Sequence, residues 1–385
     1  MRFGLSDEQE LLQAMLREFA AKELPAPRLR EIFDAGNGWD AALWRGAAGV
    51  GLQGLAVAER YGGAGLELLE LALAFEVLGE AVLPGPFLGH ALAALALSRG
   101  GSDAQRERWL PKFASGEAIG ALAIAESGDI WEPGQWSAAL DGGAVRGVKQ
   151  FVDNFNVADR CLVVCRTAEA SADSEGLSIF LVDTDSRGIS QTPLVTIAKD
   201  KQSHVQFENV RVPKANLLGD LNGGWPIAER MLDRATVLLC AQMVGAARKD
   251  SDMAIEYSKG RVAFGRPIAS FQSIQHLCAD MAMWVDGCQL LTYEALWRLD
   301  EGAPAGVEVS QAKAFCNEKC EATVRSCQQI HGGIGFMMEF DVHLFFRRVS
   351  AWTMRLGTTY EHRSRIANAL LESPGKVRLG FSVST

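Results

Sequence analysis

The sequence lacks the features of several large protein classes. Lys and Arg total 38 against 47 Asp and Glu, a formal net charge of -9, so the basic surface that neutralises nucleic-acid phosphates is not expected. The most hydrophobic stretch, LGHALAALALS, is shorter than the roughly 20 residues that cross a bilayer. The first residues, MRFGLSDEQELLQAMLREF, do not resemble a secretory signal. We therefore expect a cytoplasmic protein without a nucleic-acid or membrane partner.

Common catalytic signatures are also missing. No Walker A loop, GxSxG elbow or HExxH pair occurs, and the 6 histidines are dispersed. Gly49, Gly51 and Gly54 form a GxGxxG pattern, but they follow the helical segment DAALWRGAA rather than a strand. These glycines are better explained as turns at a helix end than as a dinucleotide-binding loop.

The 8 cysteines lie mostly in apolar or helical stretches such as CLVVC and FCNEKC. This distribution is typical of buried thiols in a reducing compartment rather than of a disulfide framework. Cys316 and Cys320 are four residues apart and share a helix face, but no CxxC pair or nearby His completes a zinc site. No metal is expected.

The chain changes texture twice. Residues 1–118 show helical periodicity, beginning with a capping-box pattern at Ser6 and Gln9. Residues 119–224 contain short segments rich in Val, Ile and Phe, typical of an antiparallel sheet or barrel. Residues 225–385 return to long helical patterns. This order predicts an α+β, multi-domain protein with a helical domain, a central β domain and a C-terminal helical domain.

Residues suited to binding a phosphate and a ring gather in the last third, in GRVAFGRPIASFQ, QQIHGGIGF and RLGTTYEH. Arg261 supplies a cation for a diphosphate, Gln272 and Gln329 supply amide donors, and Gly332 with Gly333 allow close backbone approach. Taken singly, each has an ordinary explanation as a surface charge, a polar helix face or a turn. Their combination is what favours a ligand site.

These segments, together with SDEQELLQAMLREF, VAERYGGAGL, GVKQFVDN and FENVRVPKANLLG, resemble the acyl-CoA dehydrogenase family in order and spacing over nearly the whole chain. The resemblance implies a helical domain, a central β-barrel-like domain and a C-terminal four-helix bundle. It also implies FAD at a subunit interface, an acyl-CoA substrate and an electron-transferring flavoprotein as acceptor. The positions that match the family's FAD contacts are Arg261, Phe264, Gln272, Gln329, Gly332, Gly333 and Thr358.

The chain departs from the family where the catalytic base is expected. The resemblance implies a carboxylate that removes an α-proton while hydride leaves the β-carbon for the flavin. The usual Glu directly precedes a Gly-Thr pair, and Leu356 stands there. A second family position falls on Ala235, and a third, seven residues later on the same helix face, falls on Gln242. No catalytic residue is therefore assigned in this chain.

The flavin-ring side departs as well. The family's ring-contacting Thr corresponds to Ala125, and its aromatic-Ile-Thr corresponds to Phe151-Val152-Asp153. An aspartate beside the ring would oppose the negative charge that builds up on reduction. The chain thus resembles a subunit of heteromeric, α2β2 bacterial enzymes of lipid or steroid degradation, lending its adenine-diphosphate half-site to a homologous partner that carries the base.

Three alternatives stay open at this point. A homomeric flavoenzyme could use a displaced base, for which Asp233 and Glu361 are the nearest carboxylates, although a misplacement near 1 Å can cost about a hundredfold in rate. The chain could catalyse a non-oxidative reaction of an acyl-CoA. It could also be a binding or scaffold protein that keeps only the fold.

Overall fold

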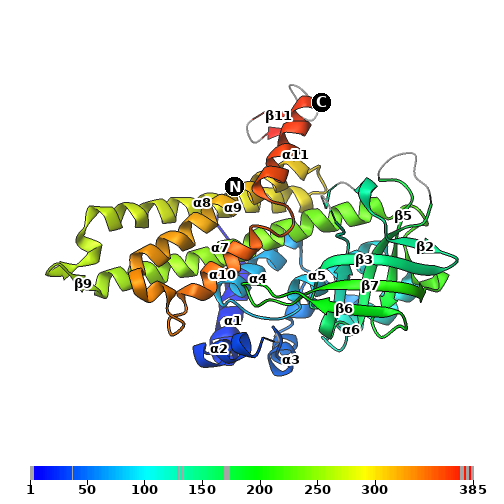
Figure 1. The fold of residues 1–385 in the computed structure, drawn as a ribbon, viewed down its shortest axis with the longest axis horizontal. Coiled ribbons are helices and arrows are strands. Elements are labelled where there is room, and N and C mark those ends of the chain that lie inside the picture. The colour runs from blue at the N-terminus through cyan, green and yellow to red at the C-terminus, as the bar shows by residue number, and fades with distance from the viewer. Residues whose placement is uncertain are drawn as a thin grey trace. The chain divides into compact units, whose positions relative to one another are not determined.

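The computed structural model describes residues 4–36, 38–127, 130–131, 133–168, 174–372, 377–378 and 381–382. They form two compact units. The first unit contains Met1–Ala21, Ala72–Leu83 and Thr236–Thr385, and the second contains Lys22–Leu71 and Pro84–Ala235. The 36-residue helix α7 (Trp225–Gly260) contributes residues to both (Figure 1).

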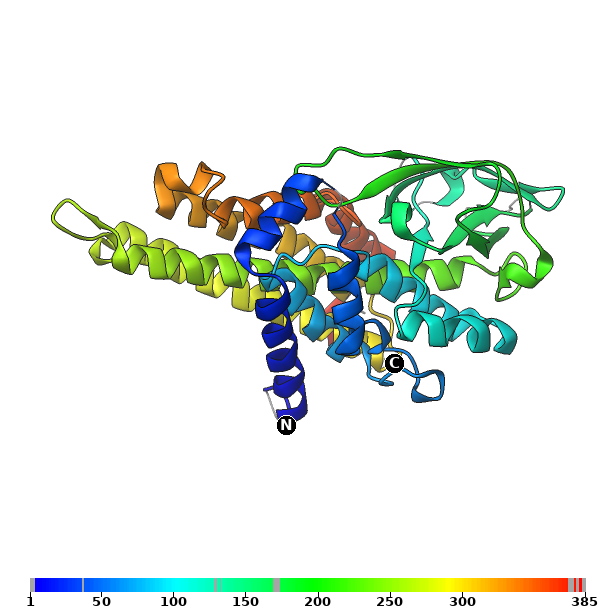
Figure 2. The same cartoon turned by 90° about the horizontal axis from the view of Figure 1, so that it is seen from below.

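The first unit is built on long helices. The C-terminal half of α7 runs beside α8 (Gln272–Asp300), and α9 (Gly306–His331) packs on α8, as Figure 2 also shows. A short hairpin of β9 (Val262–Ala263) and β10 (Arg266–Pro267) joins α7 to α8. The remaining elements are most of α1 (Asp7–Glu23) and α4 (Leu68–Glu80), α10 (Val342–Trp352), α11 (Thr359–Glu372), β11 (Val377–Arg378) and β12 (Phe381–Ser382).

The second unit contributes four shorter helices. Helix α6 begins with a capping box, in which the Ser102 hydroxyl accepts from the Gln105 backbone and the Gln105 side chain accepts from the Ser102 backbone. Helix α5 is buried along almost its whole length, which suits its run of Ala and Leu. The four are α2 (Ala26–Ala35), α3 (Ala41–Gly49), α5 (Phe87–Gly100) and α6 (Asp103–Ala114).

The same unit holds one mixed, mainly antiparallel sheet of order β6-β7-β3-β2-β4-β5-β8, with β1 pairing β4 in parallel. Its central strands β4 and β5 are buried on both faces, in keeping with their continuous apolar runs. The strands are β1 (Gly120–Ala123), β2 (Ala139–Asp141), β3 (Ala144–Asp153), β4 (Arg160–Arg166), β5 (Leu177–Asp183), β6 (Ile189–Pro193), β7 (Gln202–Arg211) and β8 (Leu217–Leu218).

The predicted fold class is confirmed, with helices, then strands, then helices along the chain. Within the described residues no pairing joins the two ends of the sheet, so it stays open rather than closing into a barrel. The capping box at Ser6 and Gln9 is present, with both of its hydrogen bonds. The predicted domain limits at residues 118 and 224 stay a prediction.

Two further features bear on the sequence-based expectations. Gly49 is the last residue of α3. Gly54 ends the 3₁₀ turn that follows, and Gly51 directly precedes this turn with a φ of 76°. The GxGxxG pattern is thus a turn at a helix end, as predicted. Among the described residues, no helix combines the length and the hydrophobicity that crossing a bilayer demands.

Candidate cofactor site

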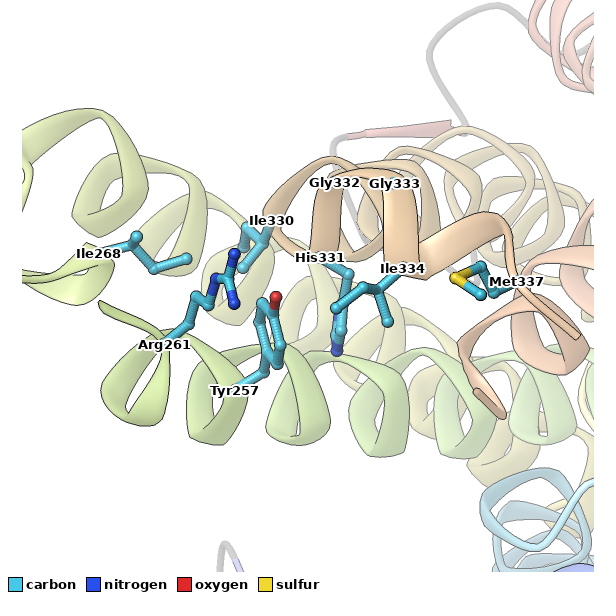
Figure 3. Close-up of a pocket in the computed structure, with 9 residues that line it drawn as sticks. All are labelled: Tyr257, Arg261, Ile268, Ile330, His331, Gly332, Gly333, Ile334 and Met337. Carbon is cyan, nitrogen blue, oxygen red and sulfur yellow. The ribbon is translucent and has the colours of Figure 1, made fainter. Parts of the chain in front are cut away.

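A pocket of about 550 Å³ opens in the first unit where the end of α7 faces the end of α9 (Figure 3). This volume lies within the usual range for small-molecule sites. The residues that line it are Tyr257, Arg261, Ile268, Ile330, His331, Gly332, Gly333, Ile334 and Met337. It therefore brings together three of the residues predicted from sequence: Arg261, Gly332 and Gly333.

Arg261 provides the pocket's cation. Its side chain is exposed and has no hydrogen-bond or ion-pair partner within the part of the chain that the structure describes. Next to it, the rings of Tyr257 and His331 stack with their centroids 4.4 Å apart at an interplanar angle of 21°. His331 Nδ1 lies 2.8 Å from the backbone carbonyl of Cys327, which can only accept, so Nδ1 carries a proton. A guanidinium free to bind an anion thus lies beside a fixed aromatic pair.

The two glycines leave space at the end of α9. Gly332 has a φ of 64°, in the left-handed region that favours glycine. A Cβ built on Gly332 or on Gly333 meets no heavy atom within 4 Å. The backbone here is therefore open to a ligand that approaches closely.

The other residues expected at the FAD site do not line this pocket. Phe264 lies in the β9–β10 turn with 94% of its surface exposed, Gln272 is the exposed first residue of α8, and Gln329 is exposed on the last turn of α9. Their contact with FAD stays a prediction. Sequence reasoning missed Tyr257 and His331, although one helical turn separates Tyr257 from Arg261 and His331 directly precedes Gly332.

The loop that carries a carboxylate in the family is held by other groups here. Leu356 has a φ of 54°, and its carbonyl accepts a hydrogen bond from His362 Nε2 at 2.8 Å. Burial lowers the pKa of His362 to about 3, so its ring is neutral. The Thr358 N–H donates to the Glu361 carboxylate at 2.6 Å, and the Glu361 N–H donates to the Thr358 hydroxyl at 3.4 Å. Glu361 therefore caps the start of α11.

The two positions on α7 offer no carboxylate either. Gln242 is half-buried where α7 crosses α4 so closely that a Cβ on Gly79 would lie 2.0 Å from the Gln242 carbonyl oxygen. Ala235 is 2% exposed. Asp233, the displaced alternative, is half-buried in the second unit.

The segment expected at the flavin ring lies in the second unit. The Ala125 carbonyl accepts a hydrogen bond from the Gln150 N–H at 2.8 Å. At the end of β3, Phe151 is 54% exposed with a φ of 54°, whereas Val152 is buried and Asp153 is half-buried. The structure thus presents an aromatic ring and a carboxylate-bearing residue at this strand end, and a methyl group in place of a hydroxyl at Ala125.

Comparison with known protein families identifies the chain. Three family models match in succession: the N-terminal domain of acyl-CoA dehydrogenases over residues 6–117, the middle domain over 123–210 and the C-terminal domain over 222–371. The chain belongs to the acyl-CoA dehydrogenase family. Membership places it among the FAD-dependent oxidoreductases that act on acyl-CoA thioesters.

Individual members of the family match along their full length. The probable acyl-CoA dehydrogenase YngJ of Bacillus subtilis is 31% identical, with 97% of this chain and 100% of that protein covered. The caffeyl-CoA reductase-Etf complex subunit CarC of Acetobacterium woodii is 30% identical, with coverage of 95% and 99%. A solved Tcur3481-Tcur3483 steroid ACAD variant is 30% identical, with coverage of 95% and 98% and a TM-score of 0.86.

The residues present in the pocket fit part of the family's cofactor. An unpaired guanidinium and open glycine backbone suit a diphosphate, and the apolar side chains of Ile268, Ile330 and Ile334 suit a flat ring. In charge and in the space around the backbone, Arg261, Gly332 and Gly333 therefore fit a diphosphate.

Proposed function

We propose that this chain is the non-basic subunit of a heteromeric, FAD-dependent acyl-CoA dehydrogenase. It lends the adenine-diphosphate half-site to a homologous partner, which supplies the base and the flavin-ring pocket. The observation that carries this proposal is the asymmetry of the site. The pocket with Arg261, Gly332 and Gly333 is intact, whereas Leu356, Ala235 and Gln242 offer no group that removes a proton.

The surface near the pocket is suited to contact with a second chain. Large apolar side chains are exposed in the β9–β10 hairpin and in the segment that follows the two glycines. Several large exposed apolar side chains in one short segment are typical of an interaction surface. The side chains are Val262, Phe264, Phe336, Met337, Met338 and Phe340, each at least 41% exposed.

Two relatives support the proposed assembly and electron acceptor. One carries a two-part name, Tcur3481-Tcur3483 steroid ACAD, and the other is a subunit of a caffeyl-CoA reductase-Etf complex. By extension, we place the chain in lipid or steroid degradation, in an α2β2 assembly that passes electrons to an electron-transferring flavoprotein.

In this proposal the chain contributes binding rather than proton transfer. FAD, when bound, accepts the hydride that leaves the acyl β-carbon. Arg261 pairs with the diphosphate charge, and Gly332 and Gly333 let the backbone approach it. Glu361 takes no part, because its carboxylate caps α11. The alternatives of a displaced base, a non-oxidative reaction and a scaffold predict different outcomes in the test below.

The test is to co-express the chain with its nearest encoded homologue and to measure FAD per complex and bleaching of the flavin by acyl-CoA under anaerobic conditions. Arg261→Ala in this chain should weaken FAD binding by ten- to a hundredfold, the loss of about 1.5–3 kcal/mol for a charge-assisted bond. Arg45→Ala removes another exposed arginine, on α3, and serves as the control.

The proposal is supported if acyl-CoA bleaches the flavin of the complex and if FAD binding is weakened by Arg261→Ala but not by Arg45→Ala. If the Glu361→Gln or Asp233→Asn variant abolishes turnover of the lone chain, the displaced-base alternative holds. Loss of the thioester without bleaching indicates a non-oxidative reaction. If no homologue forms a complex and the lone chain neither binds FAD nor reacts, the scaffold alternative holds.

A further inference from the structure

Four cysteines from three helices meet in the core of the first unit, although they are far apart in the sequence. Cys240 lies on α7, Cys288 on α8, and Cys316 and Cys320 on α9, and all four are fully buried. The expected shared helix face of Cys316 and Cys320 is confirmed. The position of Cys288 beside them could not be predicted from the sequence, because it depends on how α8 packs on α9.

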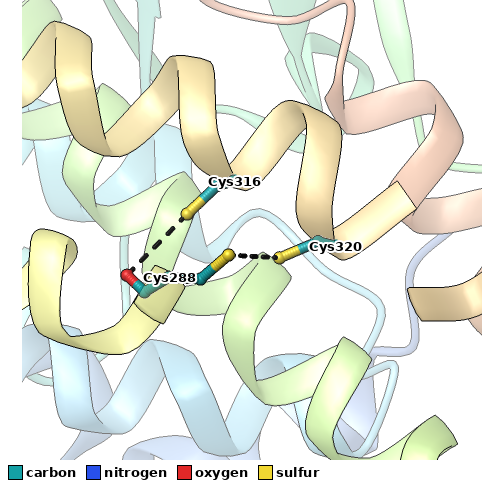
Figure 4. Close-up of side chains that lie close together, drawn as sticks. All are labelled: Cys288, Cys316 and Cys320. Atoms are coloured by element: carbon teal, nitrogen blue, oxygen red, sulfur yellow. Dashed lines mark hydrogen bonds between the residues drawn. The ribbon is translucent and has the colours of Figure 1, made fainter. Parts of the chain in front are cut away.

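The sulfur atoms lie at the spacing of metal ligands. Those of Cys288, Cys316 and Cys320 are all within 4.8 Å of one another, and those of Cys288 and Cys320 are 3.7 Å apart (Figure 4). Thiolates at about 2.3 Å from a tetrahedral Zn²⁺ lie about 3.8 Å from each other. Shifts of about 1 Å or less therefore convert the triangle into three corners of a zinc tetrahedron. Cys240 is buried beside Cys316, but its sulfur is not part of this triangle.

The surroundings balance the charge of such a site. The ammonium group of Lys313 is fully buried beside Cys240, Cys316 and Cys320, and it donates to the Asn317 side chain and, at 2.9 Å, to the Trp352 carbonyl. One Zn²⁺ with three thiolates carries a net charge of about -1. The adjacent ammonium neutralises it, as a low-dielectric core requires.

The cluster is closed to solvent. Cys240, Cys288, Cys316 and Cys320 are all 0% exposed, so a bound ion would be shielded from exchange with water.

We infer that the core of the first unit is a binding site for one thiophilic d¹⁰ divalent cation, with Zn²⁺ as the probe. Cys288, Cys316 and Cys320 are its three thiolate ligands. Binding is a ligand exchange in which Zn²⁺ displaces the thiol protons to solvent and no electron is transferred. Because the site is closed, the ion enters while the chain folds.

The experiment measures zinc in the untagged full-length chain, expressed in zinc-supplemented medium and washed with a chelator in the presence of a thiol reductant. Elemental analysis should find close to one zinc per chain. Expression with cadmium should give the ultraviolet sulfur-to-metal charge-transfer absorption of a multi-thiolate site, which ions held by surface carboxylates do not produce.

A matched pair of variants assigns the ligands. Cys316→Ala with Cys320→Ala should lower the zinc content at least tenfold. Cys161→Ala with Cys165→Ala removes two equally buried thiols from strand β4 and should leave it unchanged. The cadmium absorption needs no variant, so it stays decisive if the first pair fails to fold.

The inference is wrong if the wild-type chain holds less than about a tenth of a zinc per molecule, or if its cadmium form lacks the thiolate absorption. It is also wrong if a folded Cys316 and Cys320 variant keeps its zinc. Equal loss of zinc from both pairs of variants would likewise overturn it.

Discussion

Replacing Lys149 by Met should destabilise the second unit by about 3–5 kcal/mol, the cost of leaving a buried charge without its partner. Lys149 lies on β3 with its side chain fully buried, and its ammonium group is 2.7 Å from the Glu126 carboxylate and 2.9 Å from the Ile124 carbonyl. It also lies 4.8 Å above the Trp136 ring. Met fills a similar volume, so the loss is mainly electrostatic.

The companion change separates the charge from the packing. Glu126 also accepts hydrogen bonds from the backbone N–H groups of Ser137 and Ala138 at 2.6 and 3.1 Å. Glu126→Gln in the Lys149→Met background removes the orphaned charge and keeps an acceptor for these donors. The double variant should therefore recover more than half of the lost free energy of unfolding.

The assay is urea unfolding followed by tryptophan fluorescence, with Trp136 as a reporter inside the affected region. A cost below about 1 kcal/mol for Lys149→Met would refute the reasoning, because it would show that the ion pair contributes no more than a surface pair. A double variant as unstable as the single one would refute the electrostatic explanation. Glu126 directly follows Ala125, so the same variants report how firmly the segment expected at the flavin ring is held.

Acid should destabilise the second unit through His90. Burial lowers the pKa of His90 to about 4. Its Nδ1 accepts a hydrogen bond from the Gly120 N–H, so this nitrogen cannot take up a second ring proton without losing that bond. In the unfolded chain the ring takes up this proton near pH 6.5. The free energy of unfolding should therefore be highest above pH 6.5 and should fall by about 3 kcal/mol as the pH drops to 4. Urea unfolding measured across this range should show a much smaller decline for His90→Asn. Gly245→Ala should lower the thermal midpoint by many degrees, because the added Cβ would lie 1.9 Å from the Glu76 carbonyl oxygen. A Cβ on Gly260 has no heavy atom within 4 Å, so Gly260→Ala should leave the midpoint unchanged. Differential scanning calorimetry of the two variants checks both expectations.

Local patterns predicted the elements of this fold well. The residues that start helices, such as Ser6 with Gln9, act within one turn, so their hydrogen bonds can be read from the sequence. The spacing of apolar residues is also local: a period of 3.6 residues indicates a helix with one buried face, and a period of 2 indicates a strand with one buried face. The open edge of the sheet could not be predicted, because closure depends on the pairing of strands that are distant in the chain.

The candidate site was predictable where its residues lie in one segment. Arg261, Gly332 and Gly333 lie in short motifs, and they line one pocket. The stacking of Tyr257 on His331 depends on how α7 meets the end of α9, and the sequence contains no local signal for it. For the same reason, the proximity of Cys288 to Cys316 and Cys320 could not be predicted from the sequence.

The visible absorption spectrum and native mass of the chain, purified alone and then with its nearest homologue, test whether it lends a half-site to a partner. The chain alone should be colourless, and the complex should be yellow with one FAD per pair of subunits. A yellow homo-oligomer with one FAD per chain, whose flavin is bleached by an acyl-CoA, would contradict this proposal.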